Sequence, residues 1–319
     1  MQIIRDDDET RRATRPGAVA VGVFDGLHLG HQRVIEQIES LARDHDATAS
    51  VVTFDPHPAQ ILAPASAPRM IATLDQRLEG LDALGVEQVR VVTFDQALAA
   101  ETARSFVERV LVGELRACDV VVGEDFRFGH DREGDVALLQ RVGSELGFAT
   151  HPAPLHGDEN RWSSSAIRRA LESGALHDAN AILGRPFTMR GTVEHGDARG
   201  TGLGFATANV RTQGNQQLPA RGIYAGAART RGRRWWPAAI SIGTRPQFYS
   251  DGHLLVEAHL VGFEGDLYDD VLDVAFVQHL REEETFASTE ALVAQIDRDV
   301  VQTMEIFASF TPESSALLR

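Results

Sequence analysis

One segment near the start of the chain reads Gly22-Val23-Phe24-Asp25-Gly26-Leu27-His28-Leu29-Gly30-His31. It follows the apolar run Ala18 to Val23, and Val34, Ile38 and Leu41 after it repeat with the period of a helix. A strand that turns through glycines into a helix forms an anion site, because the free amides and the positive end of the helix dipole favour phosphate. The segment therefore predicts a phosphate-binding turn.

The histidine pair in this turn, His28 and His31, also admits a metal site, with His57, Asp25 or Asp55 as further ligands. The glycines are better explained by phosphate, because they let the backbone approach an anion closely. We expect both histidines to donate to phosphate oxygens. The predicted phosphate and nucleotide residues within the turn are Gly22, Phe24, Asp25 and Gly30.

Two further segments each follow a predicted strand. They read Thr53-Phe54-Asp55-Pro56-His57-Pro58 and Gly123-Glu124-Asp125-Phe126-Arg127-Phe128-Gly129. Open α/β sheets bind their ligands at the carboxyl ends of the strands. Phe126 and Phe128 are therefore candidates to face an aromatic ring system, with ordinary packing under a loop as the alternative.

A fourth segment, Ser163-Ser164-Ser165-Ala166-Ile167-Arg168, opens a predicted helix. It offers hydroxyls, free amides and an arginine, all of which are donors to phosphate oxygens. A serine run at this position is also a common helix cap.

The composition narrows the class of protein. The chain has 319 residues, of which 43% are hydrophobic and 24% charged, and this length favours two globular domains. A net charge of −15 makes nucleic acid and anionic lipid poor partners. All 31 basic residues are arginines, and the single cysteine, Cys118, excludes an internal disulfide. We expect a soluble protein of the reducing cytoplasm, with no leader and no membrane span.

The two halves of the chain differ in pattern. Up to about residue 183, short apolar runs alternate with helical segments, which predicts a parallel α/β sheet. After Leu183-Gly184-Arg185-Pro186, five strand-like segments separated by polar turns predict a small antiparallel barrel. Ser288 is placed to cap a closing helix. The expected inner face of that helix consists of Leu292, Ile296, Val300, Met304 and Phe307.

In their order and spacing, the four segments of the first half closely resemble the FMN adenylyltransferase module of prokaryotic bifunctional riboflavin kinase/FAD synthetases. The resemblance implies a Rossmann-like nucleotidyltransferase domain over residues 1–184 that joins FMN to the AMP part of ATP and releases pyrophosphate. It also implies that His28 and His31 are catalytic, that Ser164, Ser165 and Arg168 bind the triphosphate or pyrophosphate, and that Asp125, Phe126 and Phe128 bind flavin. Ser165 replaces the commoner threonine.

The second half resembles the family's riboflavin kinase module, which implies a kinase-like barrel over residues 185–319. The resemblance is carried by Gly200 to Asn209, by Gly222-Ile223-Tyr224-Ala225 and by Glu257-Ala258-His259-Leu260. It makes Glu257 the catalytic base and assigns Thr207 and Asn209 to magnesium and the ATP phosphates. The chain departs from the family pattern at Ala206, Ser241, Gln247, Gly262 and Asp269.

The resemblance therefore implies an enzyme that phosphorylates riboflavin to FMN and adenylylates FMN to FAD, with ATP as substrate and Mg²⁺ as cofactor. Its partners are riboflavin, FMN, FAD and ATP. One alternative is a monofunctional FMN adenylyltransferase with a degenerate kinase-like domain. Another is a nucleotidyltransferase that uses a different nucleotide, such as CTP, or a flavin analogue. A non-catalytic flavin or nucleotide sensor is a third. The sequence leaves the oligomeric state and any coupling between the domains open.

Overall fold

The protein is described from a computed structural model that covers residues 1–7, 13–154, 162–195, 205–230, 234–244, 254–312 and 315–318. Gln247 and the glycine-rich stretch 200–204 lie outside the described residues. Contacts between Cα atoms divide the chain into two compact units. The first comprises Met1–Pro68 and Arg77–Ser163, and the second Arg69–Gln76 and Ser164–Arg319.

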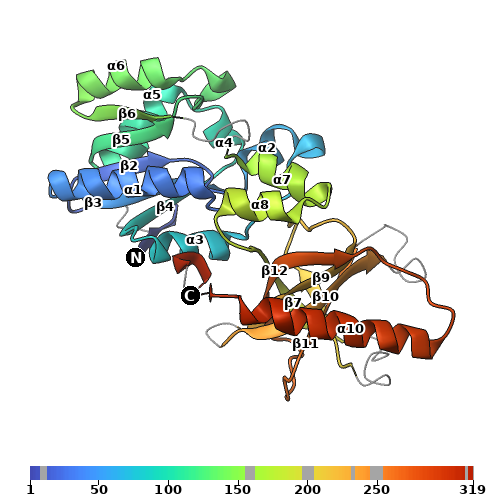
Figure 1. Cartoon of the computed structure of the whole chain (residues 1–319). Helices are drawn as coiled ribbons and strands as arrows, with labels where there is room; N and C mark the ends of the chain where they lie inside the picture. The colour runs from blue at the N-terminus through green and yellow to red at the C-terminus, as the bar shows by residue number, and fades with distance from the viewer. Residues whose placement is uncertain are drawn as a thin grey trace. The chain divides into compact units, whose positions relative to one another are not determined.

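The first unit is built on a six-stranded sheet in the order β1-β4-β3-β2-β5-β6, in which every neighbouring pair is parallel (Figure 1). All five residues of β2 are buried, as expected for a central strand covered on both faces. The predicted parallel α/β sheet is confirmed, while the short outer strands β1 and β6 were not predicted. The strands are β1 (Gln2–Ile4), β2 (Gly17–Val21), β3 (Thr48–Asp55), β4 (Gln88–Thr93), β5 (Ala117–Gly123) and β6 (Ala149–Ala153).

Helices cover this sheet and connect its strands. Strand order reverses at β2, because β3 lies on one side of it and β5 on the other. The carboxyl ends of these strands are therefore the expected ligand crevice. The helices and helical turns are α1 (Leu29–Asp44), α2 (Pro58–Leu62), η1 (Pro64–Ser66), α3 (Leu74–Ala83), α4 (Gln96–Ala99), α5 (Ala103–Phe106), η2 (Val107–Glu114), η3 (His130–Arg132) and α6 (Val136–Leu146).

The second unit contains a closed six-stranded barrel in the order β10-β11-β8-β7-β12-β9, with all described pairings antiparallel. This confirms the predicted barrel. In its wall, the buried Arg190 donates to both carboxylate oxygens of the buried Asp273 at 2.7 and 3.0 Å, and the two residues are opposite each other on neighbouring strands. The strands are β7 (Phe187–Glu194), β8 (Ala208–Thr212), β9 (Gly222–Thr230), β10 (Trp236–Thr244), β11 (Leu254–Leu260) and β12 (Val271–Arg281).

Within the described residues, three helices and a short helical turn accompany the barrel. They are α7 (Ser164–Glu172), α8 (Leu176–Leu183), α10 (Thr289–Ala308) and the turn η5 (Ala316–Leu318). Asn180 on α8 donates to the carbonyl of Phe276 at 3.0 Å and accepts from the backbone N–H of Phe187 at 2.7 Å, which ties this helix to β12 and β7. The contacts thus group residues 164–184 with the barrel. The domain boundary between residues 184 and 185 stays a prediction.

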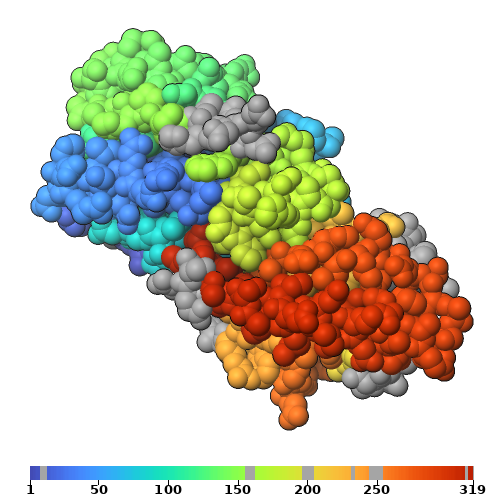
Figure 2. Space-filling model, viewed as in Figure 1, coloured from blue at the N-terminus to red at the C-terminus, as the bar shows by residue number. Residues whose placement is uncertain are grey.

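The closing helix α10 lies on the surface of the second unit (Figure 2). Ser288 caps it as predicted, by accepting from the N–H of Ala291 at 3.2 Å. The expected inner face is wrong at Met304, whose side chain is 46% exposed. The fully buried positions are instead Asp299 and Thr303, because Arg281 on β12 forms an ion pair with Asp299 at 2.7 Å and draws that polar side of the helix inward.

Candidate functional site

The predicted phosphate turn connects β2 to α1. His28 is the N-cap of α1, and its Nδ1 accepts from the backbone N–H of His31 at 3.3 Å. In the neutral imidazole the proton is therefore assigned to Nε2, which can donate to a ligand. His28 is 5% exposed and serves both as a helix cap and as a candidate phosphate donor.

The rings of His28 and His31 stack, with centroids 3.7 Å apart and planes 20° from parallel. Burial, and then the charge of His28 beside it, keep the pKa of His31 well below its usual value, so this imidazole is neutral near pH 7. The Nδ1 of His31 is buried and has no hydrogen-bond partner among the described residues. A buried polar atom without a partner is costly unless a ligand satisfies it.

The backbone of the turn is unusual as well. Phe24 and Leu27 have φ values of 54° and 44°, a region that side-chain-bearing residues seldom adopt. Gly30 lies so close to the ring of His28 that a Cβ there would be 3.1 Å from it. Asp25 is 2% exposed. Strained backbone of this kind is typical of ligand sites held by the surrounding structure.

A buried arginine, Arg77, that was not predicted from the sequence holds the phosphate turn in place through hydrogen bonds. Arg77 on α3 is 2% exposed, and it donates to the carbonyl of Val23 at 2.9 Å and to Thr53 Oγ1 at 3.1 Å. Burial lowers the pKa of Arg77, while the charges of Asp25 and Asp55 oppose that shift. The available signal was an arginine among the apolar positions of its helix, beside Leu78.

An aromatic cavity of about 620 Å³ opens at the carboxyl ends of β3, β4 and β5. Phe126 and Phe128 line it and stack on each other, with centroids 5.1 Å apart. The structure adds side chains from three further segments that the sequence did not connect. The other aromatic lining residues are Phe54, Phe94 and Phe106.

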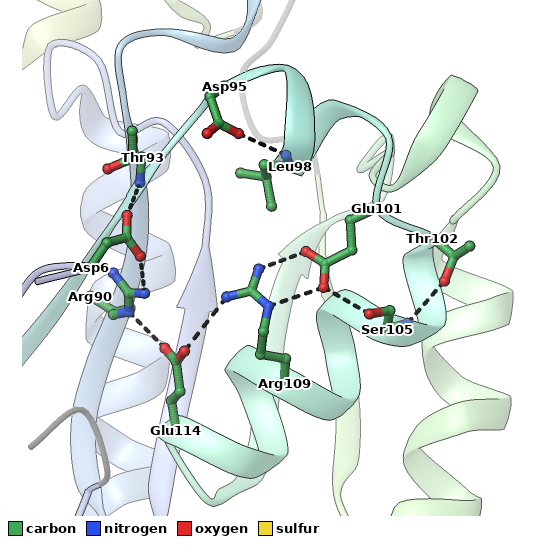
Figure 3. A network of polar contacts seen from close by, with 10 residues as sticks. All are labelled: Asp6, Arg90, Thr93, Asp95, Leu98, Glu101, Thr102, Ser105, Arg109 and Glu114. Atoms are coloured by element: carbon green, nitrogen blue, oxygen red, sulfur yellow. Dashed lines mark hydrogen bonds and ion pairs between the residues drawn. The ribbon is translucent and has the colours of Figure 1, made fainter. Parts of the chain in front are cut away.

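A chain of alternating charges fixes one wall of this cavity (Figure 3). Glu101 lines the cavity, and Arg109 donates to both of its carboxylate oxygens at 3.0 and 2.6 Å. Arg109 also pairs with Glu114 at 3.5 Å, and Glu114 accepts from the buried Arg90 on β4 at 2.7 Å. The last member is Asp6, which pairs with Arg90 at 2.5 Å. The network thus connects the cavity wall to the sheet.

Other predicted residues of the first half lie elsewhere. Asp125 is exposed and is not among the residues that line the aromatic cavity. Ser164, Ser165 and Arg168 open α7, which belongs to the second unit. There the Nε of Arg168 donates to the carbonyl of Arg69 at 2.6 Å.

In the barrel, strand register brings the predicted kinase residues together. Glu257 on β11 is directly opposite Asn209 on β8, and on its other side it is opposite Ser241 on β10. All three are half-buried and alternate with buried neighbours, so they share the outer face of the barrel wall. Thr207 lies just before β8, two residues ahead of Asn209.

Three of the family departures have a structural account. Gly262 and Asp269 have φ values of 74° and 65°, and both glycine and aspartate tolerate this left-handed region. Ala206 replaces the usual proline, and its carbonyl accepts from His259 Nδ1 at 2.8 Å, a contact that restrains the entry to β8. Ser241 is the described departure that is opposite Glu257 in the register.

The metal interpretation of the phosphate turn gains no support. His28 and His57 both use Nδ1 to cap helices, His57 by accepting from the N–H of Ala59 at 3.0 Å. Among the described residues, the one group of three close metal-ligand atoms involves His45, Cys118 and Asp119 instead.

Comparison with known proteins agrees with this arrangement. The family model described as FAD synthetase matches residues 10–166, and the one described as riboflavin kinase matches residues 183–307. The parallel sheet with its phosphate turn and the closed barrel therefore define a two-domain transferase of flavin cofactor synthesis. More specifically, the chain belongs to the family of bifunctional riboflavin kinase/FMN adenylyltransferases.

Individual relatives match nearly the whole chain. It is 37% identical to the bifunctional riboflavin kinase/FMN adenylyltransferase of Pseudomonas fluorescens, over 97% of this chain and 98% of the relative. The enzyme of the same description from Escherichia coli K12 is also 37% identical, over 98% and 100%. A crystal structure titled macrolide-efflux protein from Streptococcus pneumoniae matches with a TM-score of 0.83 and 27% identity, over 98% of this chain and 100% of that one. No helix within the described residues is long and apolar enough to cross a membrane.

Proposed function

We propose that both domains of this protein are catalytically active. The barrel phosphorylates riboflavin to FMN, and the α/β domain adenylylates FMN to FAD. ATP is the second substrate of each reaction. The observation that most directly supports kinase activity is the register of β8 and β11, in which Glu257 is opposite Asn209. Family membership supports the adenylyltransferase reaction, together with the buried Nδ1 of His31, which has no hydrogen-bond partner in the part of the chain that the structure describes. The cytoplasm is the compartment that we propose.

In the adenylyltransferase reaction, a phosphate oxygen of FMN attacks the α-phosphorus of ATP, and the bond to the pyrophosphate oxygen breaks. No protein nucleophile is required, so catalysis rests on position and charge. His28 donates to the transferring phosphate through Nε2, and His31 supplies a second donor in the same turn. Arg77 acts as a positioning residue, because it holds the turn through the carbonyl of Val23. Ser164, Ser165 and Arg168 are assigned to the triphosphate from the family motif.

The aromatic cavity is the site that we assign to the flavin ring. Its stacked pair Phe126 and Phe128, together with Phe54 and Phe106, offers the aromatic faces that a planar ring requires. Arg127, which also lines the cavity, provides a cation for the FMN phosphate. The assignment of Asp125 to flavin rests on the family motif alone.

In the kinase reaction, Glu257 accepts the proton of the ribityl 5′-hydroxyl as that oxygen attacks the γ-phosphorus of ATP and ADP departs. Thr207 and Asn209 offer a hydroxyl and an amide oxygen, which are hard donors of the type that Mg²⁺ prefers. These two residues would hold Mg²⁺ there, where it would neutralise negative charge on the ATP phosphates. The position of Asn209 opposite Glu257, with Thr207 two residues earlier in the chain, supports that role.

The second candidate is a monofunctional FMN adenylyltransferase with a binding-only barrel. It is favoured by Ser241, because the family's usual asparagine is replaced at a position opposite Glu257. A serine has a shorter reach and one donor, whereas an asparagine amide has two donors and an acceptor.

Chromatographic separation of flavins tests the proposal. The purified protein is incubated with ATP and Mg²⁺, in one reaction with riboflavin and in a parallel reaction with FMN. FAD in both reactions is the expected result. FAD from FMN alone would establish the monofunctional candidate, and FAD in neither would overturn both. Replacing ATP by CTP in each reaction tests the nucleotide.

A further inference from the structure

Four side chains that could bind a metal gather near the amino-terminal end of β5, apart from the flavin and phosphate residues. They are His45, Cys118, Asp119 and His151. One ligand atom from each of the first three lies within 4.8 Å of the other two. We propose that this cluster binds one divalent transition-metal ion of the zinc class, with His45, Cys118 and Asp119 as its protein ligands.

A local irregularity of the sheet explains how two consecutive residues reach one point. In a regular strand, neighbouring side chains point to opposite faces. Between β2 and β5 the register shifts, so that Gly17 pairs with Ala117 but Ala18 pairs with Asp119. Cys118 is the extra residue of this bulge, and bulges re-aim side chains. The thiol and the carboxylate therefore come close enough to share an ion.

The carboxylate of Asp119 is already placed by two imidazoles. It is 1% exposed, and its Oδ2 lies 2.5 Å from His45 Nδ1 while its Oδ1 lies 2.7 Å from His151 Nε2. A metal ion can take the place of the proton between His45 and Oδ2. His151 then donates to the remaining oxygen and orients the carboxylate, which is the usual task of a residue just outside a metal's ligands.

The chemical type of the three ligand atoms determines which metal ion fits the site. A thiolate, an imidazole and a single carboxylate oxygen suit Zn²⁺ or Co²⁺, whereas Mg²⁺ requires oxygen donors throughout. With metal–ligand bonds of about 2.0 to 2.3 Å, the nitrogen and oxygen atoms must separate to about 3.3 Å. His45 can make this movement, because it follows the last turn of α1 and its side chain is 51% exposed. Its exposure also gives the ion a path from solvent, and water completes the coordination.

The proposed ion lies away from the chemistry of either domain. Asp119 precedes Gly123 by four residues, or about 13 Å along the strand, and the flavin residues follow Gly123. An ion here ties the end of α1 to the start of β5 and stabilises the sheet. The proposal does not depend on the proposed function, since none of its residues is assigned to either reaction.

Cobalt binding tests the site directly. The full-length protein is stripped with a chelator and titrated with Co²⁺ while its absorption is recorded. Cys118 is the single cysteine of the chain, so any thiolate-to-cobalt charge-transfer band originates there. We expect that band to saturate at one equivalent of Co²⁺. The absence of the band would overturn the proposal, even if Co²⁺ binds through histidines alone.

Three variants complete the test. Cys118→Ser is close in size and should abolish the band, and His45→Gln should weaken Co²⁺ affinity about tenfold or more. His177→Gln, an exposed histidine on α8, is the matched control and should bind as the wild type does. Zn²⁺ should raise the melting temperature of the wild type but not that of Cys118→Ser. Equal affinity for Co²⁺ in wild type and His45→Gln, or equal stabilisation by Zn²⁺ in wild type and Cys118→Ser, would contradict the ligand assignment.

Discussion

His28 accepts a hydrogen bond from the backbone N–H of His31, and the two imidazole rings stack with their centroids 3.7 Å apart. One histidine thus starts the helix that carries the other. The consequence is that a loss of activity after mutation of His28 could reflect either a damaged helix start or a missing phosphate donor, and the two must be separated.

Two variants of His28 make this separation. His28→Ser retains a good helix cap but removes the imidazole, whereas His28→Ala removes both. We expect His28→Ser to melt close to the wild type and to lose FAD formation from FMN by about 100-fold or more. His28→Ala should lose activity similarly and be destabilised by about 1 kcal/mol. Full FAD formation by His28→Ser, measured by flavin chromatography, would remove His28 from the chemistry.

The kinase base is tested by Glu257→Gln, which preserves the shape of the side chain but cannot accept the hydroxyl proton. FMN formation from riboflavin should be lost, while FAD formation from FMN continues at the wild-type rate. Asp266→Asn, a change of the same kind at an exposed position of the second unit, serves as the control and should leave both reactions intact. Equal loss of both reactions in Glu257→Gln would show that the two activities are not separated as proposed.

The flavin cavity is tested by Phe128→Ala. The ring of Phe128 stacks on Phe126 and lines the cavity, so its removal should raise the KM for FMN about tenfold through lost aromatic contact. Phe263→Ala removes a ring that packs edge-to-face on Trp236 in the second unit, and it should leave this KM unchanged. Steady-state kinetics of FAD formation at varied FMN give both values. An unaltered KM in Phe128→Ala would place the flavin elsewhere.

The buried ion pair of the barrel makes a prediction about stability. Asp273→Asn removes the buried carboxylate that forms ion pairs with Arg190 at 2.7 Å and with Arg229 at 3.5 Å, and breaking buried pairs in this way should cost about 3 to 5 kcal/mol. Asp46→Asn breaks a pair of similar length with Arg15, but Asp46 is 99% exposed, so this control should change stability by less than about 1 kcal/mol. Urea unfolding followed by tryptophan fluorescence gives both differences. Similar losses in the two variants would contradict the expected effect of burial.

The network of Figure 3 predicts how the free energy of unfolding depends on pH. Burial by itself would raise the pKa of Asp6, but hydrogen bonds from Thr93 and Arg90 outweigh it and lower the pKa to about 2. Because the unfolded value is about 3.9, the charged carboxylate stabilises the fold fully above that pH, and its contribution declines as the pH falls toward 2.

The matching experiment compares wild type and Asp6→Asn by urea unfolding at several pH values. The wild type should be the more stable protein at pH 7, and the difference should shrink steadily between about pH 4 and pH 2. A difference of the same size at pH 2 and pH 7 would show that the charge of Asp6 is not its source.

Several features of the fold and site follow from the local sequence. The apolar runs predicted four of the six parallel strands, and the glycine-rich turn predicted a phosphate site at the start of a helix. Such features depend on neighbouring residues and on the period of a helix or strand, which can be read along the chain. Met304 shows the limit of that reading, because an apolar residue at helical spacing is exposed while Asp299 is buried by its partner Arg281.

The sequence by itself determined the class of each domain, and it predicted the phosphate turn and, through its family resemblance, the residues that we propose for the chemistry. Only the tertiary structure decided that Arg77 supports that turn, that five phenylalanines from four segments share one cavity, and that a bulge turns Cys118 toward Asp119. The physical reason is that these contacts join residues far apart in the chain. They depend on strand register and on the packing of whole helices and strands. A local pattern of residues does not reveal either of these.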